Sequence, residues 1–239
     1  MGKGKIILAL DVSTEGDAVE MVKELKDHVG AFKVGLELFN STGPKIFELL
    51  RSAGADRIFY DGKFHDIPNT VAGAARAAAR MQVWMFNVHA PGGSAMMRTA
   101  SDAAAEEADR LGIERPLILG VTVLTSISQE VLNHELSVLT LVENQVTHLA
   151  ELAQASGLDG VVASPHEIAQ IKSACGPGFL VVTPGVRPAW AAANDQARIM
   201  TPSAAVQAGA DYLVIGRAIT GASDRKGAAL RIIEELDAL

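Results

Sequence analysis

Near the start of the chain, residues 5–11 read Lys5-Ile6-Ile7-Leu8-Ala9-Leu10-Asp11. The run from Ile6 to Leu10 is apolar throughout, without polar alternation, which is typical of a parallel β-strand that is buried on both faces. Short β-rich apolar runs recur along the whole chain, and most of them are continuous in the same way. They cover residues 31–36, 57–61, 83–89, 117–123, 160–163, 179–183 and 212–215.

The segments between these runs have helical character. Residues 70–81 are rich in alanine, and residues 93–111 follow a Gly-Gly turn and carry acids and alanines. Residues 139–156 have apolar side chains at helical spacing and are followed by Gly157, a residue that commonly ends helices. Residues 221–239 form the last such segment. We find no linker, low-complexity segment or break in composition.

Eight strand–helix units in one continuous pattern predict the α/β class, and within it a single (β/α)8 TIM barrel that forms one domain over residues 1–239. A doubly wound open sheet is the alternative fold.

Composition and charge limit the possible functions. About half of the 239 residues are hydrophobic (49%), enough for a sizeable core, and the net charge of −7 argues against a nucleic-acid or membrane-surface partner. The single cysteine, Cys175, excludes an intrachain disulfide and a cysteine metal cluster. The first apolar run is too short for a secretory signal or a membrane span, so we expect a cytoplasmic protein.

The predicted fold indicates where a site should lie. In (β/α)8 barrels the chemistry takes place at the carboxyl ends of the strands, and phosphate is often held after strands seven and eight. Polar residues at the expected strand ends are therefore the candidates: Asp11, Lys33, Asp61, Lys63, His89, Thr125, Ser126, Arg187 and Arg217. No second His or Cys stands at metal-ligand spacing from His89, so we expect no metal site.

The third strand ends in the charged run Asp61-Gly62-Lys63-Phe64-His65-Asp66. In an extended chain Asp61 and Lys63 would point to the same side. Lys33 interrupts an otherwise apolar strand, and a buried ammonium needs a partner to keep its proton. Alternating Lys and Asp side chains would satisfy it and supply fixed charges in a poorly solvated pocket. On spacing alone, a solvated turn with a surface ion pair remains an alternative.

Two Gly/Arg segments follow the seventh and eighth strands. They read Thr183-Pro184-Gly185-Val186-Arg187-Pro188 and Ile215-Gly216-Arg217. Glycine lets backbone N–H groups approach an anion, and arginine can bind phosphate through two hydrogen bonds, so the pair predicts a phosphorylated ligand. Two surface arginines near ordinary turns are the alternative. Residues 190–201 between these segments are long for a barrel loop and could act as a lid.

Several motifs, in order along the chain, resemble those of bacterial orotidine 5′-monophosphate decarboxylase. The most specific is Asp61-Gly62-Lys63-Phe64-His65-Asp66-Ile67-Pro68-Asn69-Thr70. The others are Ala9-Leu10-Asp11, Phe32-Lys33-Val34-Gly35, Val123-Leu124-Thr125-Ser126, Pro184-Gly185-Val186-Arg187-Pro188 and Ile215-Gly216-Arg217. Gly62 and Phe64 depart from the bulkier or aliphatic residues that are frequent in the family. The resemblance implies conversion of orotidine 5′-monophosphate to UMP and carbon dioxide in de novo pyrimidine biosynthesis, without a cofactor.

The resemblance also implies catalytic roles. Lys63 would protonate C6 of the pyrimidine, Asp61 would lie beside the substrate carboxylate, and Lys33 would complete the charge network. Asp66 would act in the site of a neighbouring subunit, together with Ile67 and Thr70, so the active unit would be a homodimer.

Further residues would bind the substrate. Asp11 and Lys33 would contact the ribose hydroxyls, with Thr70 of the partner subunit on the ribose as well, and Ser126 would contact the amide edge of the pyrimidine. Gln196, Gly216 and Arg217 would hold the phosphate with Arg187 close by. The expected substrate-binding set is completed by Thr125 and Pro184.

Two other functions remain open at this point. Other phosphosugar decarboxylases or aldolases of the same suprafamily share the D-x-K-x-x-D spacing, but they resemble metal-dependent enzymes with an acid on the second strand. Here that strand carries Lys33, which would repel a divalent cation. A non-catalytic nucleotide-binding barrel would bind its ligand without turnover.

Overall fold

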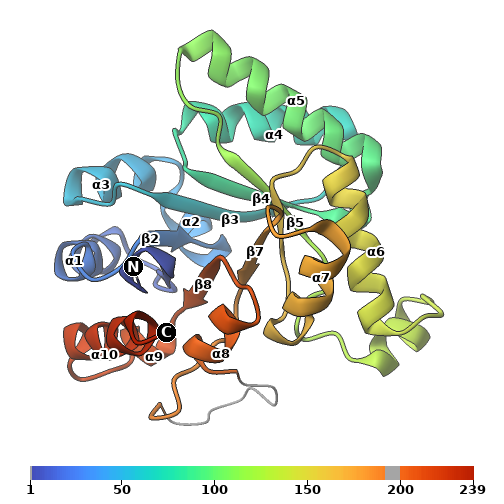
Figure 1. The fold of residues 1–239 in the computed structure, drawn as a ribbon. Helices are drawn as coiled ribbons and strands as arrows, with labels where there is room; N and C mark the ends of the chain where they lie inside the picture. Colours follow the sequence, from blue (N-terminus) through green and yellow to red (C-terminus); the bar gives the residue numbers. More distant parts are fainter. Residues whose placement is uncertain (1, 192–199) are drawn as a thin grey trace.

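The architecture is that of a computed structural model, which describes residues 2–191 and 200–239. Within these residues, eight parallel strands close into a barrel in the order β1 to β8 (Figure 1). The barrel closes because β8 pairs with β1, where Leu8 lies opposite Ile215. The strands are β1 (Ile6–Ala9), β2 (Ala31–Val34), β3 (Ile58–Phe64), β4 (Met85–His89), β5 (Leu117–Val121), β6 (Gly160–Val162), β7 (Leu180–Thr183) and β8 (Tyr212–Ile215).

Seven of these strands fall within the apolar runs that the sequence shows, and β3 continues past its run of residues 57–61 to Phe64. The prediction of a (β/α)8 barrel is confirmed, and the alternative of an open sheet is wrong, since β1 and β8 would then both be edge strands.

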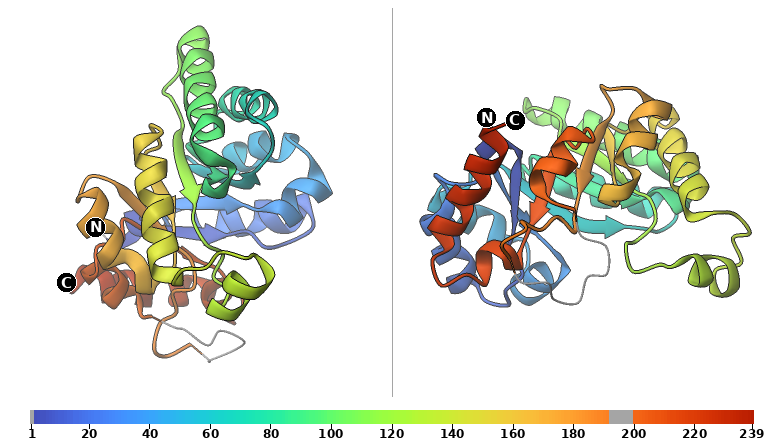
Figure 2. Two further views of the ribbon diagram at one scale, coloured as in Figure 1. Left: turned by 90° about the vertical axis from the view of Figure 1, so that its right-hand side faces the viewer. Right: turned by 60° about the horizontal axis from the view of Figure 1, so that its bottom comes forward.

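The helices surround the barrel, as the two views of Figure 2 show. They are α1 (Glu15–Leu25), α2 (Leu36–Thr42), α3 (Lys45–Ala53), α4 (Pro68–Arg80), α5 (Gly93–Leu111), α6 (Val142–Ala155), α7 (Ile168–Cys175), α8 (Pro202–Gln207), α9 (Arg217–Thr220) and α10 (Arg225–Asp237). None of the helices in the described residues is both long and apolar enough to cross a membrane. The two ends of the described chain lie together, because the Gly2 N–H donates to Asp237 Oδ1 at 2.7 Å.

Three helices begin where the sequence pattern did not predict. Helix α10 starts at Arg225 rather than residue 221, because the Asp224 side chain caps it by accepting a hydrogen bond from the Gly227 N–H at 2.8 Å. Helix α4 starts at Pro68 rather than Thr70, since proline fits the first helical position, and Ile67 is the N-cap. Helix α6 starts at Val142 rather than residue 139, because the Gln129 side chain accepts a hydrogen bond from the Val142 N–H at 2.9 Å. Helix α5 has the predicted bounds.

The apolar side chains form two layers. One fills the barrel interior and includes Ile7, Ala31, Phe59, Met85, Leu119 and Val182, all nearly inaccessible to solvent. The other lies between the outer face of the sheet and the helices, and it is larger. Side chains of a strand alternate between these two layers, so the residue two positions after an interior residue is interior again, one layer closer to the carboxyl end.

Candidate functional site

A polar layer lies above the apolar interior at the carboxyl end of the barrel. Lys33 comes two residues after Ala31, and Asp61 two residues after Phe59. Asn87 stands in the same relation to Met85 on the neighbouring strand β4 and is fully buried. The period of a strand thus brings three polar side chains from β2, β3 and β4 to one level of the barrel.

These side chains form a connected network of charges. Asp61 binds two ammonium groups, with its Oδ1 2.7 Å from Lys63 Nζ and its Oδ2 3.4 Å from Lys33 Nζ. Lys33 Nζ also lies 3.3 Å from Asp11 Oδ1. The side chains of Lys33 and Asp61 are only 10% and 14% exposed. The alternative of a solvated surface turn is therefore wrong for these two residues.

Lys63 contacts Asp61 from a backbone conformation that is not the extended one predicted for a regular strand. Its φ is 49°, in the left-handed region, and the pairing of β3 with β4 shifts register between Tyr60 and Phe64. The Asn87 side chain holds this irregular backbone, since its Oδ1 accepts from the Lys63 N–H at 2.8 Å. Its Nδ2 donates to Asp61 Oδ1 at 2.7 Å. Asn87 thus orients both charged residues at once.

The network determines the ionisation of Asp61. Burial raises the pKa of this carboxyl, but the ammonium charges of Lys33 and Lys63 and the hydrogen bonds from Lys63 and Asn87 outweigh burial, so the pKa lies below its usual value. Asp61 is therefore a carboxylate at neutral pH.

Nearby, the ring of His89 lies 5.4 Å from that of His65. Burial, with the charges of His65 and Lys63, lowers the pKa of His89 and favours its neutral form.

A cavity of about 370 Å³ opens above the network. Its floor includes Lys33, Asp61 and Lys63, and Asp11 and Thr125 line its sides. The remaining predicted residues in its lining come from the segments after β7 and β8: Pro184, Arg187, Gly216 and Arg217.

The two arginines at this end differ in exposure. Arg187 is only 6% exposed, so it is not a surface arginine near an ordinary turn, whereas Arg217 is exposed at the start of α9. The backbone around Arg187 is paired, because Val186 forms a bridge with Met200 and the Arg187 N–H donates to the Met200 carbonyl at 3.0 Å. A cavity with two cations at one end and a lysine–carboxylate network at the other suits a small anionic ligand.

Some predicted residues lie away from this cavity. Ser126 is exposed and is not among the lining residues. Asp66, Ile67 and Thr70 lie on the surface at and before the start of α4, and Ile67 is 67% exposed. The Asp66 carboxylate accepts a hydrogen bond from the Ile67 N–H at 2.6 Å. Gln196 and most of the predicted lid, residues 190–201, lie outside the described residues.

Asn87 is the site residue that the sequence reasoning missed. The signal was present, because Asn87 interrupts an apolar strand two residues after an interior side chain, as Lys33 does. A buried amide is a weaker indication of a functional site than a buried ammonium, because it does not require a counter-charge.

Replacement of Asn87 by alanine should destabilise the fold and distort the site. It removes two buried hydrogen bonds and leaves the Lys63 N–H without its acceptor, so the free energy of unfolding should fall by about 2–4 kcal/mol. Urea unfolding followed by tryptophan fluorescence measures this loss. The exposed Asn144 on α6 offers a matched control, and an Asn87→Ala variant as stable as Asn144→Ala would contradict the role given to Asn87.

The fold and the cavity together define a class of protein, the (β/α)8-barrel enzymes. In these proteins, as here, the polar site lies at the carboxyl ends of the strands. The model of the orotidine 5′-phosphate decarboxylase / HUMPS family matches residues 4–232. The chain therefore belongs to this family.

Individual relatives agree with the family. The orotidine 5′-phosphate decarboxylase of Syntrophomonas wolfei is 53% identical over 234 residues, which cover 98% of each chain. That of Heliobacterium modesticaldum is 51% identical over 98% of this chain and 96% of its own length. Among solved structures, orotidine 5′-phosphate decarboxylase from Lactobacillus acidophilus has a TM-score of 0.86 at 39% identity, covering 97% of this chain and 98% of its own.

Proposed function

We propose that this protein is a carbon–carbon lyase that decarboxylates orotidine 5′-monophosphate to UMP and carbon dioxide in de novo pyrimidine biosynthesis. The observation that carries the proposal is the Lys33–Asp61–Lys63 network at the floor of a cavity whose other end holds Arg187 and Arg217. Full-length relatives that are about half identical to this chain bear the name of this enzyme, which favours this reaction over the phosphosugar alternatives. The direct test is to follow the absorbance of orotidine 5′-monophosphate with the purified protein.

The reaction needs a stabilised negative charge at carbon. When carbon dioxide leaves C6, the electron pair of the broken bond stays on C6, with no carbonyl placed to delocalise it simply. An ammonium about 4 Å away stabilises a unit charge by about 4 kcal/mol at an effective dielectric near 20. Lys63 supplies such a charge, and Asp61 and Asn87 already fix it in place, so little reorganisation is needed during the reaction.

Lys63 then gives its proton to C6 and completes the exchange of carbon dioxide for hydrogen. Asp61 would lie beside the substrate carboxylate, and its lowered pKa keeps it charged there at neutral pH. Lys33 holds Asp61 from the other side and contacts Asp11, so this lysine can position the carboxylate while Asp11 and Lys33 bind the ribose hydroxyls.

Charge at C6 alone does not supply the roughly 8–23 kcal/mol by which enzymes commonly lower barriers. Binding energy from a distant group can supply more. In this proposal Arg187 and Arg217, with Gly216 and Gln196, bind the phosphate, and Pro184 and Thr125 complete the walls. Ser126 would contact the amide edge of the pyrimidine.

We further propose that the active unit is a homodimer. Asp66, Ile67 and Thr70 are exposed and outside the cavity of their own barrel, which suits residues that act in the site of a partner subunit. The largely exposed Ile67 would be covered by that contact. Residues 1–239 would act as one domain in the cytoplasm, without nucleic acid or membrane as partners.

Activity should be independent of divalent metals. Lys33 Nζ lies within 3.4 Å of carboxylate oxygens of both Asp11 and Asp61, so an ammonium already occupies the place where these two acids could hold a cation. Treatment with EDTA followed by gel filtration should leave kcat unchanged. Loss of activity that magnesium restores would favour the metal-dependent phosphosugar enzymes instead.

A further inference from the structure

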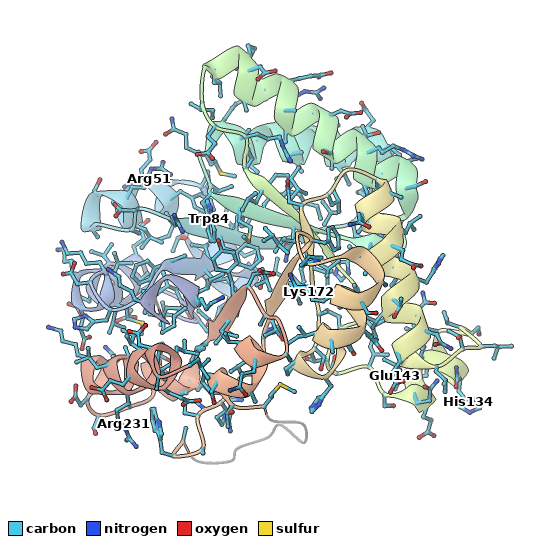
Figure 3. All side chains as sticks on the ribbon, viewed as in Figure 1. Arg51, Trp84, His134, Glu143, Lys172 and Arg231 are labelled. Carbon is cyan, nitrogen blue, oxygen red and sulfur yellow. The ribbon has the colours of Figure 1, made fainter. Side chains whose placement is uncertain are left out.

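Trp190, after β7, and Ser203, in α8, both contact the last helix, α10. The Arg231 guanidinium of this helix lies over the indole ring of Trp190, 4.1 Å from the ring centre. Arg231 is labelled on α10 in Figure 3. One turn further along α10, Glu235 Oε1 accepts a hydrogen bond from the Ser203 N–H at 2.9 Å. Arg231 and Glu235 are four residues apart and therefore lie about 6 Å apart along the same face.

Both contacts are linked to Arg187 by short stretches of backbone. Trp190 follows it by three residues, in a turn closed by the hydrogen bond from the Ala191 N–H to the Pro188 carbonyl. Ser203 follows Met200, the residue that pairs with Val186 and Arg187. Trp190 and Met200 both pack against the outer hydrophobic core. Helix α10 thus contacts the chain at Trp190, three residues after Arg187, and at Ser203, three residues after the Met200 that pairs with Arg187.

We infer that Trp190 and Arg231 are positioning residues for the anion end of the cavity: the stacked pair fixes the backbone on which Arg187 enters the cavity. Arg231 itself is exposed and is not among the residues that line the cavity. It acts through Trp190, because its guanidinium contacts the indole ring and the ring packs against the outer hydrophobic core. The inference rests on the proposed function for the identity of the anion, a nucleoside monophosphate.

The affinity for UMP, measured by calorimetry, tests the inference without requiring turnover. Arg231→Ala and Trp190→Leu should each weaken UMP binding about two- to fivefold, as expected for the loss of a cation–π contact made by an exposed arginine. The double variant should be no weaker than either single variant, because the two residues act as one unit. Trp190→Phe keeps a ring and should bind nearly as well as the wild type. With orotidine 5′-monophosphate as substrate, KM should rise and kcat at saturation should change little.

Lys226→Ala is the control, since Lys226 is an exposed cation on the same helix. A loss of affinity in this variant equal to that of Arg231→Ala would reveal a general charge effect and overturn the inference. So would Arg231→Ala binding UMP like the wild type, effects that multiply in the double variant, or Trp190→Phe as weak as Trp190→Leu. A wild-type protein that does not bind UMP would overturn both proposals, whereas binding without turnover would overturn only the proposed function.

Discussion

Replacement of Lys63 by alanine is expected to lower kcat by about 10⁴-fold or more, because it removes both the charge that stabilises C6 and the proton donor. The 2.7 Å contact between Lys63 Nζ and Asp61 shows that the ammonium is already held at the floor of the cavity. UMP has a hydrogen at C6 and does not use this charge, so its affinity should change by less than about tenfold. Single-turnover kinetics and UMP calorimetry measure the two quantities separately.

Two comparisons make this prediction specific to Lys63. Lys23→Ala removes an exposed lysine from α1 and should retain full activity. If Lys63→Ala loses UMP binding and turnover in parallel while its melting temperature is unchanged, Lys63 is a binding residue rather than the proton donor.

The second large effect is the recovery of activity in mixed dimers, which combine one subunit of each of two inactive variants. Lys63→Ala and Asp66→Ala should each be nearly inactive alone, but a mixture that exchanges subunits should recover about one quarter of the wild-type activity. Half of the dimers are then hybrids, and each hybrid has one intact site, built from the Lys63 of one subunit and the Asp66 of the other. The placement of Asp66 outside the cavity of its own barrel is the structural basis of this expectation.

The matched control mixes Lys63→Ala with Asp61→Ala. Both residues line the same cavity of one barrel, so no hybrid has an intact site and no activity should return. Mass spectrometry of differently tagged subunits establishes that exchange has taken place. Exchange without recovery in the Lys63→Ala and Asp66→Ala mixture would place Asp66 outside the catalytic machinery.

Much of the fold could be predicted because its strands leave a strong pattern. Buried parallel strands need continuous apolar runs, and seven of the eight described strands lie within the predicted runs. Apart from the end of β3, which continues to Phe64, the errors lie at helix starts. The start of α6 depends on the Gln129 side chain, thirteen residues earlier in the chain, and periodicity within the helix does not contain that information.

The site was predictable where a polar residue interrupts an interior run. Lys33 and Asp61 follow interior side chains at a spacing of two, and a buried charge requires a partner. The left-handed backbone of Lys63 was not predictable, because it depends on the hydrogen bond from its N–H to Asn87 on the neighbouring strand. The roles of Asp66, Ile67 and Thr70 came from family resemblance alone, since no pattern within one chain indicates the site of a partner subunit.

The central claim is that this barrel decarboxylates orotidine 5′-monophosphate through Lys63, and a direct assay tests it. Purified, EDTA-treated protein at micromolar concentration is mixed with the substrate, and its ultraviolet absorbance is followed while UMP is quantified by chromatography. The account predicts that the substrate absorbance disappears, with one UMP formed for each substrate molecule consumed, and that Lys63→Ala leaves it nearly constant. Wild-type protein that binds the substrate but leaves its absorbance unchanged would contradict the account and identify a non-catalytic nucleotide-binding barrel.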